Sequence, residues 1–194
     1  MTVLVITTGG TIGAIAYDDP RYPPKFSTMP PKGKDLVKDV LLTLFSRFQT
    51  HCVSLEPRDS KQIDEAYRRN ILRVISSSPE NRVLITHGTD TLLTTADFLY
   101  KHTINVSKFH KKRIILTGAM TPLANGKDSD GYLNLEFSLA WLTSQTHDLS
   151  KINIVLCGFQ KHGEWKPRLY PYKPNRWEKV YDPDGRYNRL RELP

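Results

Sequence analysis

Two clusters of threonine and glycine contain groups that can carry chemistry, "TTGGTIG" at residues 7–13 and "THGTDT" at residues 86–91. Glycine lets the backbone approach a ligand closely, and free N–H groups at the start of a following helix suit an oxyanion or a carboxylate. A threonine hydroxyl becomes an effective nucleophile when a proton acceptor, such as a neutral lysine or a tyrosinate, lies beside it. These residue types indicate a small-molecule site for an anionic or carbonyl compound, at which hydrolysis or acyl transfer is available.

Each of these residues also has a purely structural explanation. A Gly-Gly pair after a strand commonly forms a turn, and threonine at a strand end commonly serves as an N-cap. Asp90 in the second cluster is a candidate N-cap as well, and Ser60 is one for a helix that begins near Gln62. The functional interpretation therefore needs a fold that brings the separate clusters to one place.

The elements that position these residues can be predicted from hydrophobic patterning. Apolar runs without internal proline predict five strands, at residues 2–7, 50–55, 82–86, 113–117 and 152–157. Apolar residues at three- and four-residue steps predict helices at 36–48, 63–75, 91–102 and about 134–146. Strands that alternate with helices pair in parallel through right-handed crossovers. We therefore predict an α/β fold in which residues 1–157 form a layered, mostly parallel sheet with helices on both faces.

Residues 158–194 form a basic C-terminal extension that is rich in proline and aromatic residues, and we expect an ordered, extended arm. The predicted architecture is thus a single domain plus this arm.

In such sheets ligands bind at the edge where loops leave the carboxyl ends of the strands. Both threonine clusters occupy that position, as do "EPRDSKQ" after the second strand and "TGAMTPLANGKDSDG" after the fourth. The segment after the first strand has five prolines between residues 20 and 31 and is too long for an ordinary connection. We expect it to be a lid that carries Tyr17 and Tyr22.

The same segments resemble a known family. "TTGGTIG" followed by "ITHGTDTLLTTADFL" is similar to the two signature segments of the bacterial-type L-asparaginases, and "ILTGAMTPLANGKDSDGYLNLEFSLAW" is similar to their third conserved stretch. The resemblance covers about residues 2–157, which is the amino-terminal domain in that family. It implies an amidohydrolase that converts L-asparagine, or a related small amide, to L-aspartate and ammonia through a threonine acyl-enzyme.

The resemblance implies a role for each catalytic position. Thr11 would attack the side-chain amide, with Thr89 as the second threonine and Asp90 as the neighbour that also binds the substrate α-amino group. The lid tyrosine would be Tyr22, whose distance from "GGT" suits that role better than the distance of Tyr17.

The base lysine of the family is harder to locate in "CGFQKHGEWKPRLYPYKPN". Lys173, directly before Pro174, is the first choice and Lys166 is the second. With neither lysine in place the protein would bind ligand but turn it over slowly, because the threonine would lack its base.

The resemblance also implies a substrate-binding set. Ser60 in "RDSKQ" matches the serine that holds the substrate α-carboxylate, and Asp59 before it fits the pattern of some members. Backbone N–H groups near Gly88 and Thr89 would receive the developing oxyanion and the substrate carboxylate. The remaining positions of the set are Gly10, Asp90 and Ala119.

Composition limits the remaining classes of function. No stretch is apolar enough for a signal sequence or a membrane span, so we expect a cytoplasmic protein without a membrane partner. Six scattered histidines and two cysteines lack metal-ligand spacing, so we expect no metal and no cofactor. Cys52 and Cys157 are expected to be buried, unreactive thiols, and His87 is expected to be a hydrogen-bonded strand-end residue.

Two departures from the family leave alternatives open. Lys61, after the serine, adds a positive charge near the carboxylate pocket or, as we favour, at a solvated helix start. We expect no counterpart of the smaller second domain of the family in residues 158–194, which are too few to form it. The chain is therefore either an active enzyme or an aspartate- or asparagine-binding module with weak or no turnover. We expect a homo-oligomer, a dimer, that binds a small-molecule amide.

A third hypothesis concerns the net charge of +8. About half of the excess lies in residues 158–194, which hold nine Lys/Arg against five Asp/Glu, and "KFHKKR" at 108–113 is a second basic patch. Binding of nucleic acid would follow from these patches and would weaken steeply with salt. It is the weakest hypothesis, because basic and aromatic residues do not interleave on one predicted element.

Overall fold

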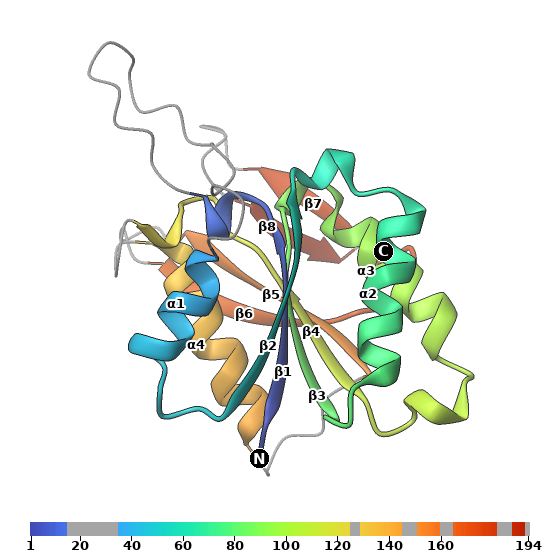
Figure 1. The fold of residues 1–194 in the computed structure, drawn as a ribbon. Helices are drawn as coiled ribbons and strands as arrows, with labels where there is room; N and C mark the ends of the chain where they lie inside the picture. The colour runs from blue at the N-terminus through green and yellow to red at the C-terminus, as the bar shows by residue number, and fades with distance from the viewer. Residues whose placement is uncertain (15–34, 125–128, 145–150, 160–164, 182–187, 193–194) are drawn as a thin grey trace.

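The computed structural model describes residues 1–14, 35–124, 129–144, 151–159, 165–181 and 188–192. Its centre is a six-stranded sheet in the order β2-β1-β3-β4-β5-β6 (Figure 1). The strands are β1 (Val3–Gly9), β2 (Thr50–Arg58), β3 (Arg82–Thr86), β4 (Arg113–Thr117), β5 (Ile152–Phe159) and β6 (Trp165–Pro171). The first five pair in parallel, and β6 pairs antiparallel to β5.

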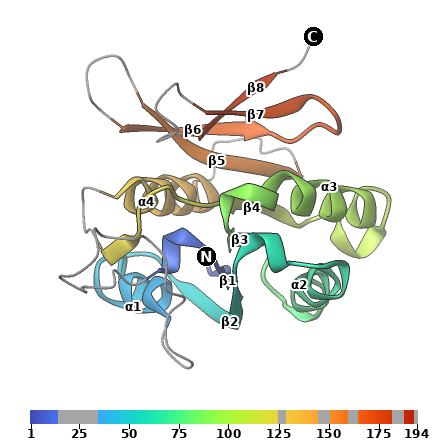
Figure 2. The ribbon, with the colours of Figure 1, turned by 90° about the horizontal axis from the view of Figure 1, so that it is seen from above.

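Helices cover both faces of this sheet. They are α1 (Leu36–Thr43), α2 (Glu65–Ser77), α3 (Leu92–Thr103) and α4 (Asp130–Thr143). Figure 2 shows α1 and α4 on one face and α2 and α3 on the other. Parallel strands require such crossovers, because the chain must run back to the end of the sheet at which one strand began before the next parallel strand can start. The predicted α/β class, with helices on both faces, is confirmed.

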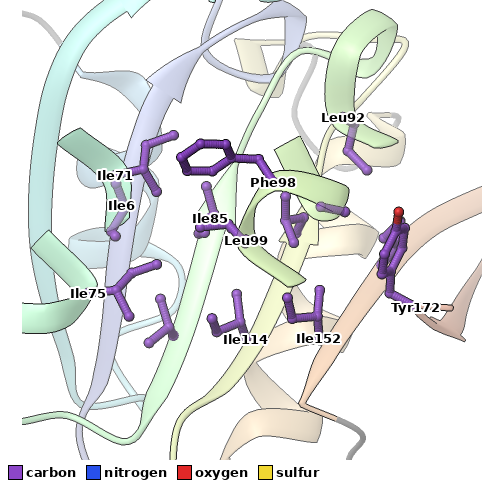
Figure 3. Packing of buried hydrophobic residues seen from close by; sticks show 14 of the residues in the cluster. Ile6, Ile71, Ile75, Ile85, Leu92, Phe98, Leu99, Ile114, Ile152 and Tyr172 are labelled. Atoms are coloured by element: carbon purple, nitrogen blue, oxygen red, sulfur yellow. The ribbon is translucent and has the colours of Figure 1, made fainter. Parts of the chain in front are cut away.

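The sheet separates two apolar cores. The core under α2 and α3 includes Ile6, Ile71, Ile85, Leu99 and Ile114 (Figure 3). The core under α1 and α4 includes Val5, Leu41, Leu84, Ile115 and Leu139. Successive residues of one strand alternate between the two cores, because side chains of a strand point to opposite faces of the sheet. Burial on both faces explains why the strands are apolar at almost every position.

The first helix is shorter than its apolar periodicity predicts. The apolar residues at helical spacing continue to Phe48, but α1 ends at Thr43. Phe45, beyond the helix, is nevertheless fully buried, and its ring centroid lies 4.9 Å from that of Tyr132. The predicted end is wrong because the turn after the helix also buries apolar residues, and burial alone does not distinguish a turn from a helix.

The fourth helix begins earlier than the predicted start near residue 134. It starts at Asp130, because the Ser129 hydroxyl accepts a hydrogen bond from the Gly131 N–H at 3.0 Å and so caps the helix. The helix therefore begins close to the end of the loop that follows β4.

The C-terminal part of the chain contributes strands to the structure. β6 belongs to the main sheet, which thus extends past the boundary expected at residue 157. The strands β7 (Trp177–Tyr181) and β8 (Asn188–Glu192) form a separate antiparallel pair. The Trp177 indole N–H donates to the Pro171 carbonyl oxygen at 3.0 Å, and its ring packs edge-on against Tyr170.

The two cysteines lie in different environments. Cys157 is buried, as expected, and burial raises the pKa of its thiol. Cys52 is only partly buried, contrary to the expectation, because it lies on β2 at the edge of the sheet. Burial is still the main reason that the pKa of the Cys52 thiol is raised to about 11. Both thiols are therefore protonated near neutral pH.

Candidate functional site

The strand ends bring the predicted site segments to one edge of the sheet. Thr7 of β1 lies in register with Thr86 of β3, which lies in register with Thr117 of β4. On the other side of β1, Gly9 pairs with Arg58 at the end of β2. Because all four strands run in parallel, the loops that follow them leave the sheet at the same level. The predicted convergence at the carboxyl edge is confirmed.

The loops after β1 and β3 are in direct backbone contact. Gly10 has φ of 77°, and a β-carbon built there would lie 2.5 Å from the Cα and 2.6 Å from the nitrogen of Gly88. No larger residue fits without displacing the neighbouring backbone. The Gly10 N–H also donates to the Arg58 carbonyl oxygen at 3.2 Å, so the same residue contacts the end of β2. Glycine is required here for a close approach of two chain segments.

The loop after β2 packs against the loop after β3. A β-carbon on Gly88 would lie 2.6 Å from the Cβ and 2.8 Å from the Oγ of Ser60, which is buried. The Thr91 hydroxyl donates to the Ser60 carbonyl oxygen at 2.6 Å. The short 3₁₀ helices η2 (Ser60–Gln62) and η3 (Thr89–Thr91) are thereby held side by side.

The loop after β4 closes the other side of the site. A β-carbon on Gly118 would lie 2.5 Å from the His87 carbonyl oxygen and 2.9 Å from the Thr89 Cγ2. The Thr89 hydroxyl lies 3.9 Å from the Met120 Sδ, to which it donates a weak hydrogen bond. Ala119, between Gly118 and Met120 in the same loop, is buried. Thr89 is therefore confined by the loop after β4.

Thr11 and Thr89, the two threonines predicted to be catalytic, each follow a glycine, and the two glycines are in contact. Thr11 comes directly after Gly10 and opens the 3₁₀ helix η1 (Thr11–Gly13), and Thr89 comes directly after Gly88 and opens η3. Both threonines are partly exposed, and neither is enclosed in the apolar core. The contact between the two glycines thus brings the start of η1 to the start of η3.

Asp130 holds the loop after β4 in place. Its buried carboxylate accepts hydrogen bonds from the Met120 N–H at 3.0 Å, from the Thr121 N–H at 2.9 Å and from the Thr121 hydroxyl at 2.7 Å. Desolvation raises the pKa of Asp130, although these hydrogen bonds act in the opposite direction. Asn134, one turn further along α4, donates to the Gly118 carbonyl oxygen at 2.9 Å. The first two turns of α4 thus anchor the loop that confines Thr89.

His87 is a buried, neutral hydrogen-bonding residue at the end of β3. Burial lowers its pKa to about 4. Its Nδ1 lies 2.7 Å from the Gly88 carbonyl oxygen and must donate to it, so Nε2 accepts from the Thr95 hydroxyl at 2.9 Å. Thr95 in turn accepts from the Arg68 Nε at 3.1 Å. The expectation that His87 is a hydrogen-bonded strand-end residue is confirmed.

A pair of opposite charges lies at the outer side of the site. The Lys61 Nζ lies 3.6 Å from the Asp90 Oδ2, with both side chains substantially exposed. The Asp59 carboxylate accepts from the Lys61 N–H at 2.8 Å and caps η2. The alternative that Ser60 caps a helix beginning near residue 62 is wrong, since Asp64 caps the following helix, α2.

The two candidate lysines lie at opposite edges of the sheet. β6 runs antiparallel to β5, so its first residues lie at the carboxyl edge of the parallel strands and its last residues lie at the far edge. Lys173 follows β6 and lies 3.7 Å from Glu192, away from the other site residues. Lys166 is exposed and pairs with Gly158 near the carboxyl edge. The structure therefore does not bring Lys173, the first choice, to the site.

The two candidate lid tyrosines, Tyr17 and Tyr22, lie outside the described residues. Within the described ranges, no group of three or more His, Cys, Asp or Glu side chains is arranged to hold a metal ion. Likewise, none of the described helices is long and apolar enough to cross a membrane.

Sequence reasoning missed two parts of the site. The contact between Met120 and Thr89 has no local signal, because it joins two loops that are distant in the sequence. Asp130 did have a signal, since a serine followed directly by an acidic residue is typical of a helix start. A helix predicted to begin there would have placed its first carboxylate beside the loop after β4.

The family described as "Asparaginase, N-terminal" matches residues 2–163 of this chain. A comparison with curated protein sequences found no match. The family match covers most of the chain and includes all four loops at the carboxyl edge of the sheet.

Solved structures of L-asparaginases are similar in fold. L-asparaginase I from Vibrio cholerae O1 biovar eltor str. N16961 superposes with a TM-score of 0.69 and 22% identity, over 100% of this chain and 52% of that chain. The probable cytoplasmic L-asparaginase from Campylobacter jejuni gives 0.58 and 21%, and the thermostable enzyme from Thermococcus kodakarensis gives 0.56 and 23%. Each of these two matches covers 79% of this chain and 43% of that chain. The chain thus spans about half the length of these enzymes.

Proposed function

This chain belongs to the asparaginase family, and on that premise we propose that it is an asparaginase-like amidohydrolase. The proposed reaction hydrolyses L-asparagine, or a related small amide, to L-aspartate and ammonia through a threonine acyl-enzyme. The observation that carries the proposal is the backbone contact between Gly10 and Gly88, which favours one shared site for Thr11 and Thr89.

The proposed reaction has two halves. In the first, the Thr11 oxygen attacks the amide carbonyl carbon, and its proton passes through a base to the amide nitrogen. The carbon–nitrogen bond then breaks, ammonia leaves, and the acyl group stays on Thr11 as an ester. In the second, water attacks the ester carbonyl carbon, the proton returns to Thr11, and the carboxylic acid product leaves. Backbone N–H groups near Gly88 and Thr89 are the proposed donors to the oxyanion of each half.

The proposed proton acceptor is a lysine and not His87. Both ring nitrogens of His87 already serve in hydrogen bonds to Gly88 and Thr95. Lys166 is now the preferred candidate over Lys173, and its register beside Gly158 supports this choice. A lysine can accept the threonine proton only in its neutral form, so this role requires that the bound substrate desolvates Lys166.

The remaining proposed roles concern the substrate. Ser60 is proposed to hold the α-carboxylate with Asp59 beside it, and Asp90 is proposed to bind the α-amino group. The contacts of Gly88 with Ser60, and of Thr91 with the Ser60 carbonyl oxygen, support a single pocket made by η2 and η3. Gly10 and Ala119 are proposed to line the same pocket, since both belong to loops at this edge.

A second candidate function is a module that binds aspartate or asparagine with little or no turnover. The position of Lys173 at the opposite edge of the sheet favours this candidate. A site without its base would still bind the ligand but would hydrolyse it slowly. A homodimeric assembly and a cytoplasmic location stay predictions, which light scattering and cell fractionation can test.

The decisive experiment incubates purified protein with L-asparagine and measures ammonia release. We expect release that is reduced at least about a hundredfold by Thr11→Ala and by Thr89→Ala. Thermal unfolding of both variants should match that of the wild-type protein, because both hydroxyls lie outside the apolar core. Ammonia release that survives both substitutions would overturn the proposed mechanism. Calorimetric binding of aspartate without any ammonia release would favour the binding module.

A further inference from the structure

The ion pair between Lys61 and Asp90 joins two segments of the candidate site that are in direct contact. Lys61 lies on η2 and Asp90 lies on η3, and their charged atoms are 3.6 Å apart. The two 3₁₀ helices are held together by the hydrogen bond from Thr91 to the Ser60 carbonyl oxygen and by the contact of Gly88 with Ser60. The backbone of the site therefore keeps the Lys61 ammonium within reach of Asp90.

The charged residues before Lys61 in the same loop make other contacts. Arg58 at the end of β2 lies 3.2 Å from Glu56 and 4.0 Å from Asp64, on the side of the loop that faces α2. Asp59 accepts from the backbone N–H of Lys61 and so fixes the start of η2. The Lys61 side chain thus meets the Asp90 carboxylate where the loops after β2 and β3 come together.

A substrate ammonium that binds Asp90 has to compete with the ammonium of Lys61. We propose that Lys61 is a specificity-determining residue, which weakens the preference of the site for amides that carry an α-amino group. The site then also accepts monoamides of dicarboxylic acids that lack this group, such as succinamate. This inference rests on the proposed function, because it assumes that Asp90 binds the α-amino group of an amide substrate.

The size of the effect follows from the exposure of the pair. The Lys61 side chain is 74% exposed and the Asp90 side chain is 40% exposed, so solvent screens their attraction. Pairs of this kind change an equilibrium by about two- to fivefold. Lys61 is therefore expected to shift the relative preference between two substrates and not to decide whether either substrate reacts.

The test compares asparagine with succinamate, which differ only in the α-amino group. The kcat/KM values for both are measured by ammonia release for the wild-type protein and for Lys61→Gln. We expect the ratio of asparagine to succinamate to rise about two- to fivefold in Lys61→Gln, mainly through a lower KM for asparagine. Two controls should keep the wild-type ratio: Lys61→Arg, which retains the positive charge, and Lys108→Gln, which removes an exposed charge at the opposite edge of the sheet. The rise should shrink at high salt.

Several results would overturn the inference. An unchanged or lower ratio in Lys61→Gln would show that Lys61 does not compete for Asp90, and a higher KM for asparagine would show that Lys61 binds the substrate itself. Equal ratios in Lys61→Gln and Lys61→Arg would exclude charge as the cause.

A binding measurement separates this inference from the proposed reaction. Calorimetry measures the affinities of the same variants for aspartate and for succinate. The ratio of these two affinities reports the preference for an α-amino group without any reaction. If no variant releases ammonia but the affinity ratio shifts as expected, the proposed hydrolysis fails and the role of Lys61 stands. If hydrolysis occurs and neither ratio shifts, the role of Lys61 fails alone. If neither ligand binds and neither amide reacts, both proposals are wrong.

Discussion

The backbone of Gly10 lies against the backbone of Gly88, and a β-carbon at position 10 would come within 2.5 Å of the Gly88 Cα. This contact joins the turns after β1 and β3 and brings the segments that begin with Thr11 and Thr89 to one place.

Gly10→Ala is expected to destabilise the protein by about 1–3 kcal/mol, because the new methyl group meets the Gly88 backbone and because φ at this position is positive. Urea denaturation gives the change in the free energy of unfolding, and ammonia release should fall as well. Gly13→Ala is the matched control, since its β-carbon would meet the Val37 side chain at an ordinary 3.8 Å. If the two variants were equally stable, the contact would not be as tight as the structure indicates.

Asp130→Ala is expected to lower the free energy of unfolding by about 2–3 kcal/mol, because it leaves the Met120 N–H, the Thr121 N–H and the Thr121 hydroxyl without their buried acceptor. Any ammonia release should fall too, since the same loop confines Thr89.

Asp130→Asn keeps one acceptor oxygen and is expected to lose less stability than Asp130→Ala. Thermal unfolding of both variants provides the measurement. An alanine variant as stable as the wild-type protein would show that the loop after β4 does not depend on this carboxylate.

The protein is expected to lose stability in mild acid, because His87 is buried in its neutral form. Burial lowers its pKa from 6.5 to about 4, so between these values the unfolded chain binds more protons than the folded chain does. The contribution of His87 is therefore fully present above pH 6.5 and is lost as the pH falls toward 4, by about 3 kcal/mol in total. Urea denaturation at several pH values across this window measures the effect.

His87→Asn cannot titrate and is expected to show a flatter dependence on pH in this window, together with lower stability at pH 7. His110→Gln, which changes an exposed histidine near the opposite edge of the sheet, should keep the dependence of the wild-type protein. If His87→Asn and the wild-type protein had the same slope, another group would be responsible for it.

Lys112 is a buried cation at the C-terminal end of α2. Its Nζ donates to the carbonyl oxygen of Ser78, the C-cap of α2, and to that of Glu80, each at 2.6 Å. Lys112→Met should cost about 1–3 kcal/mol in unfolding free energy, measured by urea denaturation. Lys111→Met, at the exposed neighbouring position, is expected to change stability by less than about 0.5 kcal/mol. Equal effects of the two substitutions would contradict this role.

Much of the fold was predictable because its signals are local. Runs such as 83–85 and 114–116 are apolar at every position, which is typical of strands buried on both faces. Alternation of strands with helices then determines parallel pairing and a common carboxyl edge for the loops. For this reason the convergence of the segments that contain Thr11, Ser60 and Thr89 could be predicted before any contact was known.

Other features depended on contacts between distant segments. The location of Lys173 is decided by the reversal of the chain at β6, because an antiparallel strand carries the residues after it to the far edge of the sheet. The burial of Phe45 beyond the end of α1 depends on packing against Tyr132, and the burial of Asp130 depends on the loop after β4.

By itself, the sequence determined the type and order of the main strands and helices between residues 2 and 157 and the edge at which the candidate site lies. Only the tertiary structure decided which charges and hydroxyls meet there, such as Lys61 with Asp90 and Thr89 with Met120. The physical reason is that periodicity and turn residues act over a few neighbouring positions. A contact between loops instead depends on the geometry of the whole sheet, which no single segment encodes.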